Sequence, residues 1–219
     1  MHLSNSEENY LKEIYSLSME EDRKIPNLRI GQRLGLNPPA VTEMLRKLAE
    51  KELILYTRSE GASLTEEGEI LALQVIRKHR IWETFLVRTL GFTWDEVHEV
   101  AEQLEHIRSP KLLDELDRFL GHPEFDPHGE PIPNALGIMP NQKAVALHLC
   151  SPGQKLELLA VTIQRPDFLQ ALKQAGISLK SSLIIREINP EMLMLQTESG
   201  SEIPVSVSDA RCMLVSECR

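Results

Sequence analysis

The sequence is poor in cysteine and aromatic residues, and it lacks any long apolar run. Only 3 of its 219 residues are cysteine and 5% are aromatic. Three thiols cannot all pair with one another and show no metal-knuckle spacing, which predicts reduced thiols in the cytoplasm. No apolar stretch approaches the roughly 18 residues of a membrane span, and the first residues lack the pattern of a secretory leader. We therefore expect a cytoplasmic protein without a membrane partner.

An excess of positive charge is also missing. The chain carries 24 lysines and arginines against 33 acidic residues, a formal charge of −9, which argues against coating nucleic acid through overall positive charge. Residues 24–58 are a local exception, with seven basic and three acidic side chains. Residues 76–140 are the most acidic segment and hold five of the 7 histidines. Imidazole and carboxylate concentrated together indicate a cation site.

Changes in composition divide the chain into three predicted domains. Residues 1–75 and 76–140 have helical patterns, and a dense run of prolines at 121–140 predicts an extended linker. Residues 141–219 contain short apolar runs between turn clusters, which is typical of a small β-barrel. The expected strands are residues 144–149, 156–163, 183–188, 193–197 and 203–207, with one helix at 166–175. The predicted fold class is mainly α with a small β part.

The N-terminal segment fits a winged helix-turn-helix. Ser4 can cap a first helix, a second short helix covers residues 28–34, and a turn at Gly35 leads to a third helix at residues 38–51. Two short strands around a Gly-containing loop, a wing, are expected at residues 53–65. This order is typical of DNA-binding modules. Similar units also serve in dimerisation, and a basic window can be a solvated face.

In the DNA-binding interpretation, the start of the third helix faces base edges in a major groove. Proline and alanine can contact thymine methyl groups, glutamate can accept from cytosine N4, and basic side chains lie near phosphates. The predicted DNA-binding residues are Arg29, Pro38, Pro39, Ala40, Thr42, Glu43, Arg46, Lys47 and Arg58. One copy offers few phosphate contacts, so we expect a homodimer on two half-sites of double-stranded DNA.

Two groups of imidazole and carboxylate side chains have helical spacing. His79 and Glu83 are four residues apart on a helix expected to run to about residue 90, so they share a face. The second group comprises His98, Glu102, Glu105 and His106, which a single helix would keep within an arc of about 100°. Either group alone is commonly an ion pair or an acidic surface. Together, on adjacent helices, they indicate a metal site in a helical bundle.

Three short patterns carry a resemblance to a known family. They are Arg77-Lys78-His79-Arg80 with Glu83, Val97-His98-Glu99 continuing through Glu102 to His106, and Pro127-His128-Gly129 with Pro131-Ile132-Pro133. This combination resembles the diphtheria toxin repressor family of metal-dependent bacterial transcription regulators. The resemblance covers essentially the whole chain, most specifically its first 140 residues, and implies an SH3-like fold for residues 141–219. It also implies a homodimeric repressor of metal homeostasis genes that binds palindromic operator DNA, with neither enzymatic activity nor a small-molecule substrate.

The resemblance further implies the metal ligands. One implied site uses Glu102, Glu105 and His106 with Asn9, and another uses His79, Glu83 and His98 with help near Gln164. Manganese sensors of the streptococcal type use the linker, where Asp126 and His128 stand at the ligand positions. Iron-sensing members carry cysteine at the position of Glu102 and manganese-sensing members carry glutamate, so Glu102 favours manganese. Lys12 stands where small manganese sensors have a second carboxylate, which disfavours their paired-metal arrangement.

Donor chemistry agrees with this implied metal class. Carboxylate, amide and imidazole ligands without thiolate suit Mn²⁺ or Fe²⁺ better than a structural Zn²⁺, although Zn²⁺, Co²⁺ or Ni²⁺ can substitute in vitro. The order of Mn²⁺ first and Fe²⁺ next is what the resemblance implies. Two other functions stay open. A winged-helix regulator of an organic ligand would need an apolar pocket. A metal-dependent hydrolase would share the His/Glu cluster, but the sequence lacks a His-Glu-x-x-His helix, a nucleophile elbow and a Gly-rich phosphate loop.

Overall fold

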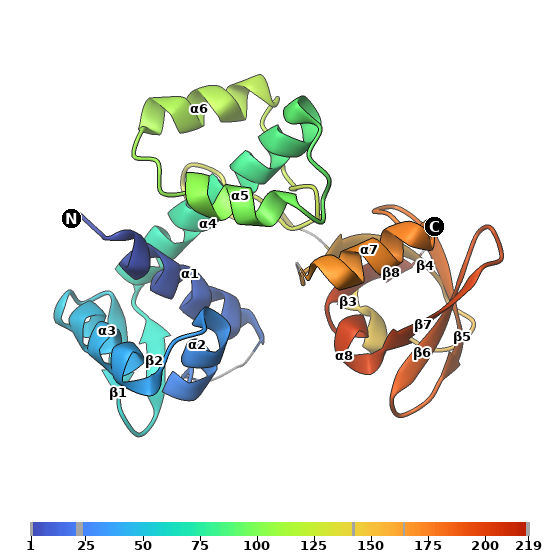
Figure 1. Ribbon diagram of the computed structural model, residues 1–219, viewed down its shortest axis with the longest axis horizontal. Coiled ribbons are helices and arrows are strands. Elements are labelled where there is room, and N and C mark those ends of the chain that lie inside the picture. The colour runs from blue at the N-terminus through green and yellow to red at the C-terminus, as the bar shows by residue number, and fades with distance from the viewer. Residues whose placement is uncertain (1, 21–23, 142, 164, 218–219) are drawn as a thin grey trace. The chain divides into compact units, whose positions relative to one another are not determined.

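The computed structural model of the protein describes residues 2–20, 24–141, 143–163 and 165–217 (Figure 1). The chain forms two compact units. The first comprises Met1–His79, Glu105–Arg108 and Pro133–Ile138, and the second comprises Arg80–Leu104, Ser109–Ile132 and Met139–Arg219. Within the described ranges, no helix is both long and apolar enough to cross a membrane. The division into domains at residues 1–75, 76–140 and 141–219 stays a prediction.

The first unit contains the helices and the hairpin expected near the N-terminus. Its elements are α1 (Asn5–Glu20), α2 (Asn27–Leu34), α3 (Pro38–Glu50), β1 (Ile54–Thr57) and β2 (Gly61–Leu64). Helix α1 starts with a reciprocal cap, because Glu7 N donates to Ser4 Oγ and Ser4 N donates to the Glu7 carboxylate. Helix α2 ends at Gly35, whose φ of 66° is the left-handed conformation that favours glycine. Asn37 caps α3 by accepting from Ala40 N.

Helix α3 packs through one face. Val41, Leu45 and Leu48 are all buried, at the spacing of four and three residues that places side chains on the same side of a helix. The antiparallel hairpin of β1 and β2 lies against the preceding chain at Gly61, where a Cβ would meet Ile25 O at 2.2 Å. Only glycine fits this close approach.

Three helices follow, and one of them ends earlier than its sequence suggests. They are α4 (Glu66–Leu90), α5 (Val97–Leu104) and α6 (Pro110–Phe119). Glu96 accepts from Thr93 N before α5, and Ser109 accepts from Leu112 N at the start of α6, as the capping patterns predict. Glu105 and His106 lie in a turn after α5. The expectation that they share one helix face with His98 was therefore wrong, because tertiary contacts described below hold both side chains.

The C-terminal part of the second unit is an antiparallel sheet in the strand order β3-β8-β4-β5-β6-β7. Its elements are β3 (Val145–Ala146), η1 (Leu147–Leu149), β4 (Lys155–Val161), α7 (Pro166–Gln174), β5 (Ser182–Ile188), β6 (Met192–Thr197), β7 (Glu202–Ser206), α8 (Val207–Ala210) and β8 (Met213–Glu217). The strand β8 was not predicted, and half of the strand expected at residues 144–149 is a 3₁₀ turn, η1. No pairing among the described residues joins β3 to β7, so the closed barrel is not confirmed and the sheet is open.

Stability in acid should depend on Glu7, whose buried carboxylate pairs with Lys47 of α3 and with Lys51 directly after this helix. Burial by itself would raise the pKa of Glu7, but hydrogen bonds from Lys51, the Ser4 backbone and Lys47 outweigh burial and lower this pKa from 4.5 to about 2. The resulting stabilisation is present above pH 4.5 and is lost as the pH falls towards about 2. We expect Glu7→Gln to lower the free energy of unfolding at neutral pH by about 1–3 kcal/mol, and to flatten its acid dependence. Urea denaturation across this pH range measures both effects. An equal loss in the exposed control Glu69→Gln would contradict the assignment.

Candidate metal centre and nucleic-acid interface

The carboxylate of Glu83 is fully buried and faces polar side chains from separate segments of the second unit. Glu83, on α4, and His128, in the linker, are both 0% exposed, and Asp126 is 4% exposed. Glu83 Oε2 lies 3.5 Å from His128 Nδ1. One ligand atom from each of Glu83, Asp126 and His128 lies within 4.8 Å of the others. This is the geometry of a cation site with two carboxylates and one imidazole.

A compact turn positions Asp126. Its Oδ1 accepts from the backbone N of His128 at 2.8 Å and of Glu130 at 2.9 Å, which fixes the carboxylate orientation. Its buried Oδ2 accepts no hydrogen bond and lies 3.6 Å from Arg80 Nε. Arg80 also donates to Pro131 O and to Glu130. One arginine of α4 therefore anchors the linker and forms an ion pair with the Asp126 oxygen that accepts no hydrogen bond.

The imidazole of His128 is oriented by its backbone and by its second nitrogen. His128 Nε2 lies 2.7 Å from Trp94 O, and the two rings stack with an interplanar angle of 11°. A carbonyl only accepts, so Nε2 carries the hydrogen and Nδ1 is the nitrogen that faces Glu83. Next to it, Gly129 has a φ of +81° and no room for a Cβ, which would lie 1.9 Å from Leu159 O. This close approach lets Val161 N donate to His128 O.

Burial and neighbouring charges shift the pKa values of two members of this group. Burial, together with Glu83 and Glu130, raises the pKa of Asp126 from 3.8 to about 7. Burial would lower the pKa of His128, but Glu83 and Asp126 raise it from 6.5 to about 9. Two buried carboxylates with oxygen atoms within 4.8 Å of each other favour a positive charge between them. A divalent cation would supply that charge and displace the protons.

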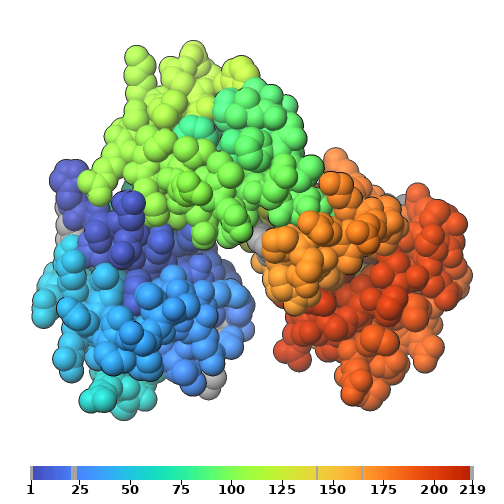
Figure 2. Space-filling view, in the orientation of Figure 1, coloured from blue at the N-terminus to red at the C-terminus, as the bar shows by residue number. Residues whose placement is uncertain are grey.

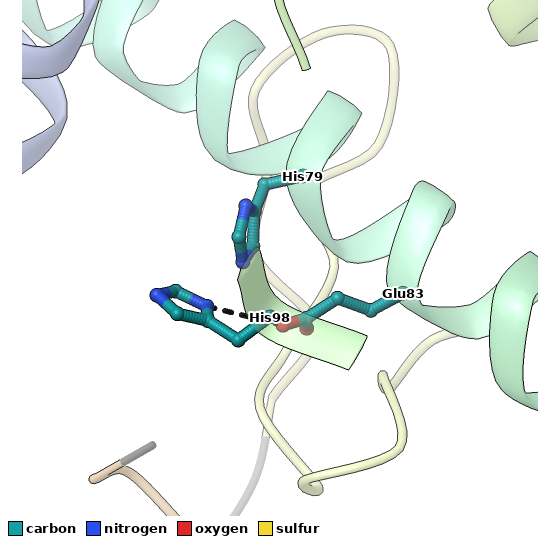
Figure 3. Close-up of side chains that lie close together, drawn as sticks. All are labelled: His79, Glu83 and His98. Atoms are coloured by element: carbon teal, nitrogen blue, oxygen red, sulfur yellow. Dashed lines mark hydrogen bonds and ion pairs between the residues drawn. The ribbon is translucent and has the colours of Figure 1, made fainter. Parts of the chain in front are cut away.

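Glu83 also belongs to a second group, which the sequence predicted. Figure 3 shows His79 and Glu83 one turn apart on α4, with His98 beside the Glu83 carboxylate. His98 Nδ1 lies 3.4 Å from Glu83 Oε1, and ligand atoms of His79, Glu83 and His98 all lie within 4.8 Å of one another. The two candidate groups thus share one carboxylate.

The other implied ligands are not gathered in this way. Glu102 has a side chain that is 49% exposed and lies 3.4 Å from His98 Nε2. Glu105 and His106 contact Lys12 and Glu8 of α1. Among the described residues, Glu102, Glu105 and His106 do not form a group with ligand atoms in mutual reach. Asn9 offers a buried Oδ1 without a hydrogen-bond partner, and Gln164 lies outside the described residues.

The predicted nucleic-acid residues gather along α3 and the hairpin. A groove is lined by Pro38, Pro39, Thr42, Glu43, Arg46, Lys47, Glu50 and Arg58. Ala40 is exposed beside it, and Arg29, on α2, is exposed but lies 3.8 Å from Glu20. The space-filling view shows this blue part of the chain at the surface (Figure 2). Thr42 is half-buried and donates to Pro38 O, and Lys47 lies 3.2 Å from Glu7.

Several residues that build the metal centre were missed from the sequence. Arg80 was noted only as part of a motif, and Trp94 was assigned no role at the site, although its carbonyl orients His128. The signal for Arg80 was its position one turn from Glu83 on the helix face that the metal group uses. The role of the Trp94 carbonyl has no signal in the sequence, since every residue carries a backbone carbonyl.

Two family models match the chain. The model described as "Iron dependent repressor, N-terminal DNA binding domain" matches residues 2–62. The model described as "Iron dependent repressor, metal binding and dimerisation domain" matches residues 65–134. Together they cover α1 to α3, most of the hairpin, α4 to α6 and most of the linker.

Named proteins are similar over different lengths. The iron-dependent repressor IdeR of Mycobacterium tuberculosis is 36% identical over 145 residues, which are 65% of this chain and 62% of IdeR. A solved structure titled "Manganese-dependent transcriptional repressor complex with manganese" is 33% identical, with a TM-score of 0.90 over 97% of this chain and 100% of that one. The manganese regulator SloR is 32% identical, with a TM-score of 0.83 over 97% and 98%.

Without metal, the buried carboxylates should make stability fall as the pH rises. Folding raises the pKa of Asp126 from 3.8 to about 7. Proton binding by Asp126 therefore contributes to the free energy of unfolding in full below pH 3.8, and this contribution is lost as the pH rises towards 7. His128 acts in the same direction between pH 6.5 and about 9. In chelator, we expect Asp126→Asn to be more stable than the wild type by about 2–4 kcal/mol near pH 8, and similar near pH 4. Chemical denaturation measures this difference. Asp114→Asn, at an exposed site, is the control, and an equal gain there would refute the assignment.

Proposed function

Because this chain belongs to the iron-dependent repressor family, we propose that it represses transcription by binding operator DNA when a divalent metal ion is bound. The observation that carries the proposal is the buried group of Glu83, Asp126 and His128, in which one ligand atom of each residue lies within 4.8 Å of the others. Members of this family are transcriptional repressors rather than enzymes. The comparisons support neither the hydrolase nor the regulator of an organic ligand.

We propose Glu83, Asp126 and His128 as ligands, with His79 and His98 as further donors around the shared carboxylate. When bound, the ion supplies the positive charge that balances the two carboxylates. Arg80 and Trp94 hold the linker ligands in position, so fewer degrees of freedom are lost on binding. The ligands Asn9, Glu102, Glu105, His106 and Gln164 remain predictions from the family resemblance.

Mn²⁺ is our proposed metal, with Fe²⁺ as the next candidate. The proposed donors are carboxylate oxygens and imidazole nitrogens without thiolate, which suit both ions. The structural neighbours described as a manganese-dependent repressor and as the manganese regulator SloR support Mn²⁺, and the similarity to the iron-dependent repressor IdeR supports Fe²⁺. The cytoplasmic location and the SH3-like character of residues 141–219 also stay proposals.

Operator DNA fits the surface of α3. The helix starts with the exposed, uncharged Pro38, Pro39 and Ala40, which can approach base edges closely. Arg46 follows on the same exposed surface, and Arg58 extends from the hairpin. These guanidinium groups suit phosphates on either side of a groove.

A second copy of the chain fits the exposed apolar surface of α6. Phe119 is 67% exposed and Leu112 is 38% exposed, and both line a groove with Phe85 of α4. This groove lies within the segment matched by the metal binding and dimerisation model. Exposed aromatic and aliphatic side chains of this kind favour association, which supports a homodimer that presents two α3 helices.

Operator binding should require both metal and Glu83. A DNA sequence can be selected from a pool of random duplexes in Mn²⁺ and then used to compare affinities with Mn²⁺ and with chelator. We expect chelator to weaken wild-type binding about 5–150-fold, the usual range of allosteric coupling, and Glu83→Gln to bind weakly in both conditions. Glu99→Gln changes an exposed carboxylate on α5 and should behave as the wild type. Equal wild-type affinities in Mn²⁺ and chelator would reject metal activation.

Removal of Arg46 or Arg58 should weaken DNA binding through lost phosphate contacts. For Arg46→Ala and Arg58→Ala we expect weaker binding to all sequences and a salt dependence whose slope decreases by about 1 per site. Titrations of the selected duplex at several salt concentrations measure the slope. Arg186→Ala, on the exposed surface of β5, is the matched control. An unchanged slope in both α3 and hairpin variants would place the DNA elsewhere.

A further inference from the structure

The side chains around Glu105 form a charge network that is complete without a metal ion. Lys12 Nζ lies 2.8 Å from Glu105 Oε1 and 3.0 Å from Oε2, and His79 Nδ1 lies 2.6 Å from Oε2. Glu105 is 0% exposed and Lys12 is 8% exposed. All of these residues belong to the first compact unit. A buried carboxylate thus has a buried ammonium group on both of its oxygens.

The neighbouring imidazole is engaged in a similar way. His106 Nδ1 lies 2.6 Å from Glu8 Oε2, and Lys78 Nζ lies 3.4 Å from Glu8 Oε1. Two carboxylates, Glu8 and Glu105, are therefore matched by two ammonium groups, Lys12 and Lys78. The pKa of Glu105 reflects the match, because burial would raise it but His79 and Lys12 lower it. This balance differs from that of Asp126, whose pKa is raised.

Such a network does not fit a divalent ion. An ion bound to Glu105 would lie close to the Lys12 ammonium group, in a setting where water screens their repulsion poorly. It would also compete for oxygens that already accept three hydrogen bonds. Asn9 Oδ1 accepts no hydrogen bond and could be a metal ligand. A neutral amide oxygen, however, does not supply the negative charge that Lys12 already neutralises on Glu105. The residues present therefore disagree with the metal site that the family resemblance implies at Glu105.

We propose that Lys12 acts as a built-in cation that keeps the Glu105 and His106 group free of metal, so that metal binds only at the Glu83 carboxylate. Metal binding at Glu83 rests on the proposed function, whereas the exclusion of metal by Lys12 does not. Glu105 then has a different role. As the acceptor for His79 Nδ1, it leaves His79 Nε2 as the nitrogen that can bind metal.

Mn²⁺ binding to variants that lack Glu83 tests the proposal directly. Electron paramagnetic resonance of free Mn²⁺ gives the number of ions bound per chain. We expect the Glu83→Ala chain to bind no ion whose binding depends on Glu105. Adding Lys12→Gln to Glu83→Ala should create one Mn²⁺ site per chain, and adding Glu105→Gln as well should abolish it. Lys12→Arg keeps the positive charge, so in the Glu83→Ala background it should not create the site.

Two results would overturn the proposal. One is Mn²⁺ binding to the Glu83→Ala chain that Glu105→Gln removes while Lys12 is intact. The other is a folded Glu83→Ala, Lys12→Gln chain, with native circular dichroism, that gains no ion. Should Lys12→Gln fail to fold, the comparison of Glu83→Ala with and without Glu105→Gln still decides, because both chains retain Lys12. A wild-type chain that binds no more Mn²⁺ than Glu83→Ala would contradict the proposed function and leave the Lys12 comparison valid.

Discussion

The burial of the Glu83 carboxylate beside Asp126 is the interaction on which the proposed regulation depends. Two carboxylates in a dry environment repel each other, and the pKa of Asp126 is raised to about 7 as a result. The fold tolerates this arrangement because Arg80 and the protonated His128 offset part of the charge. A divalent ion completes the offset, so its binding can stabilise one conformation of the linker over others. That difference in affinity is the physical requirement for a metal switch.

The contrast with Glu105 shows how similar residues reach different outcomes. Both groups combine buried carboxylates with histidine. Glu105 receives an ammonium group from Lys12, whereas Glu83 faces another carboxylate and two imidazoles. The nearest fixed charges therefore distinguish the two groups, and on this difference rests the proposal that only the Glu83 group binds metal. A set of ligand residue types is not sufficient evidence for a site until its counter-charges are known.

The first unit shows the same principle at the proposed DNA surface. Lys47 and Lys51 are near the buried Glu7, so part of the basic character of α3 is used to hold it against α1. No ion pair with Arg46 or Arg58 occurs within the part of the chain that the structure describes. These two arginines are therefore better placed to bind phosphates than the two lysines are. The count of basic residues in the sequence indicated the surface, and the ion pairs distinguish which of its basic side chains are already engaged.

The sequence by itself determined the order of the N-terminal helices, the hairpin and the shared face of His79 and Glu83. These follow from local rules, namely helical periodicity, capping and glycine conformations, which act over a few residues. The same rules failed at Glu105 and His106, where the helix ends, and they gave no evidence for β8 or an open sheet. Asp126 and His128 came only from family resemblance. Tertiary structure alone decided that Gly129 brings the linker against β4, that Trp94 orients His128 and that Lys12 neutralises Glu105. Those pairings join residues far apart in the chain, and burial, which makes their charges strong, exists only once the chain has folded.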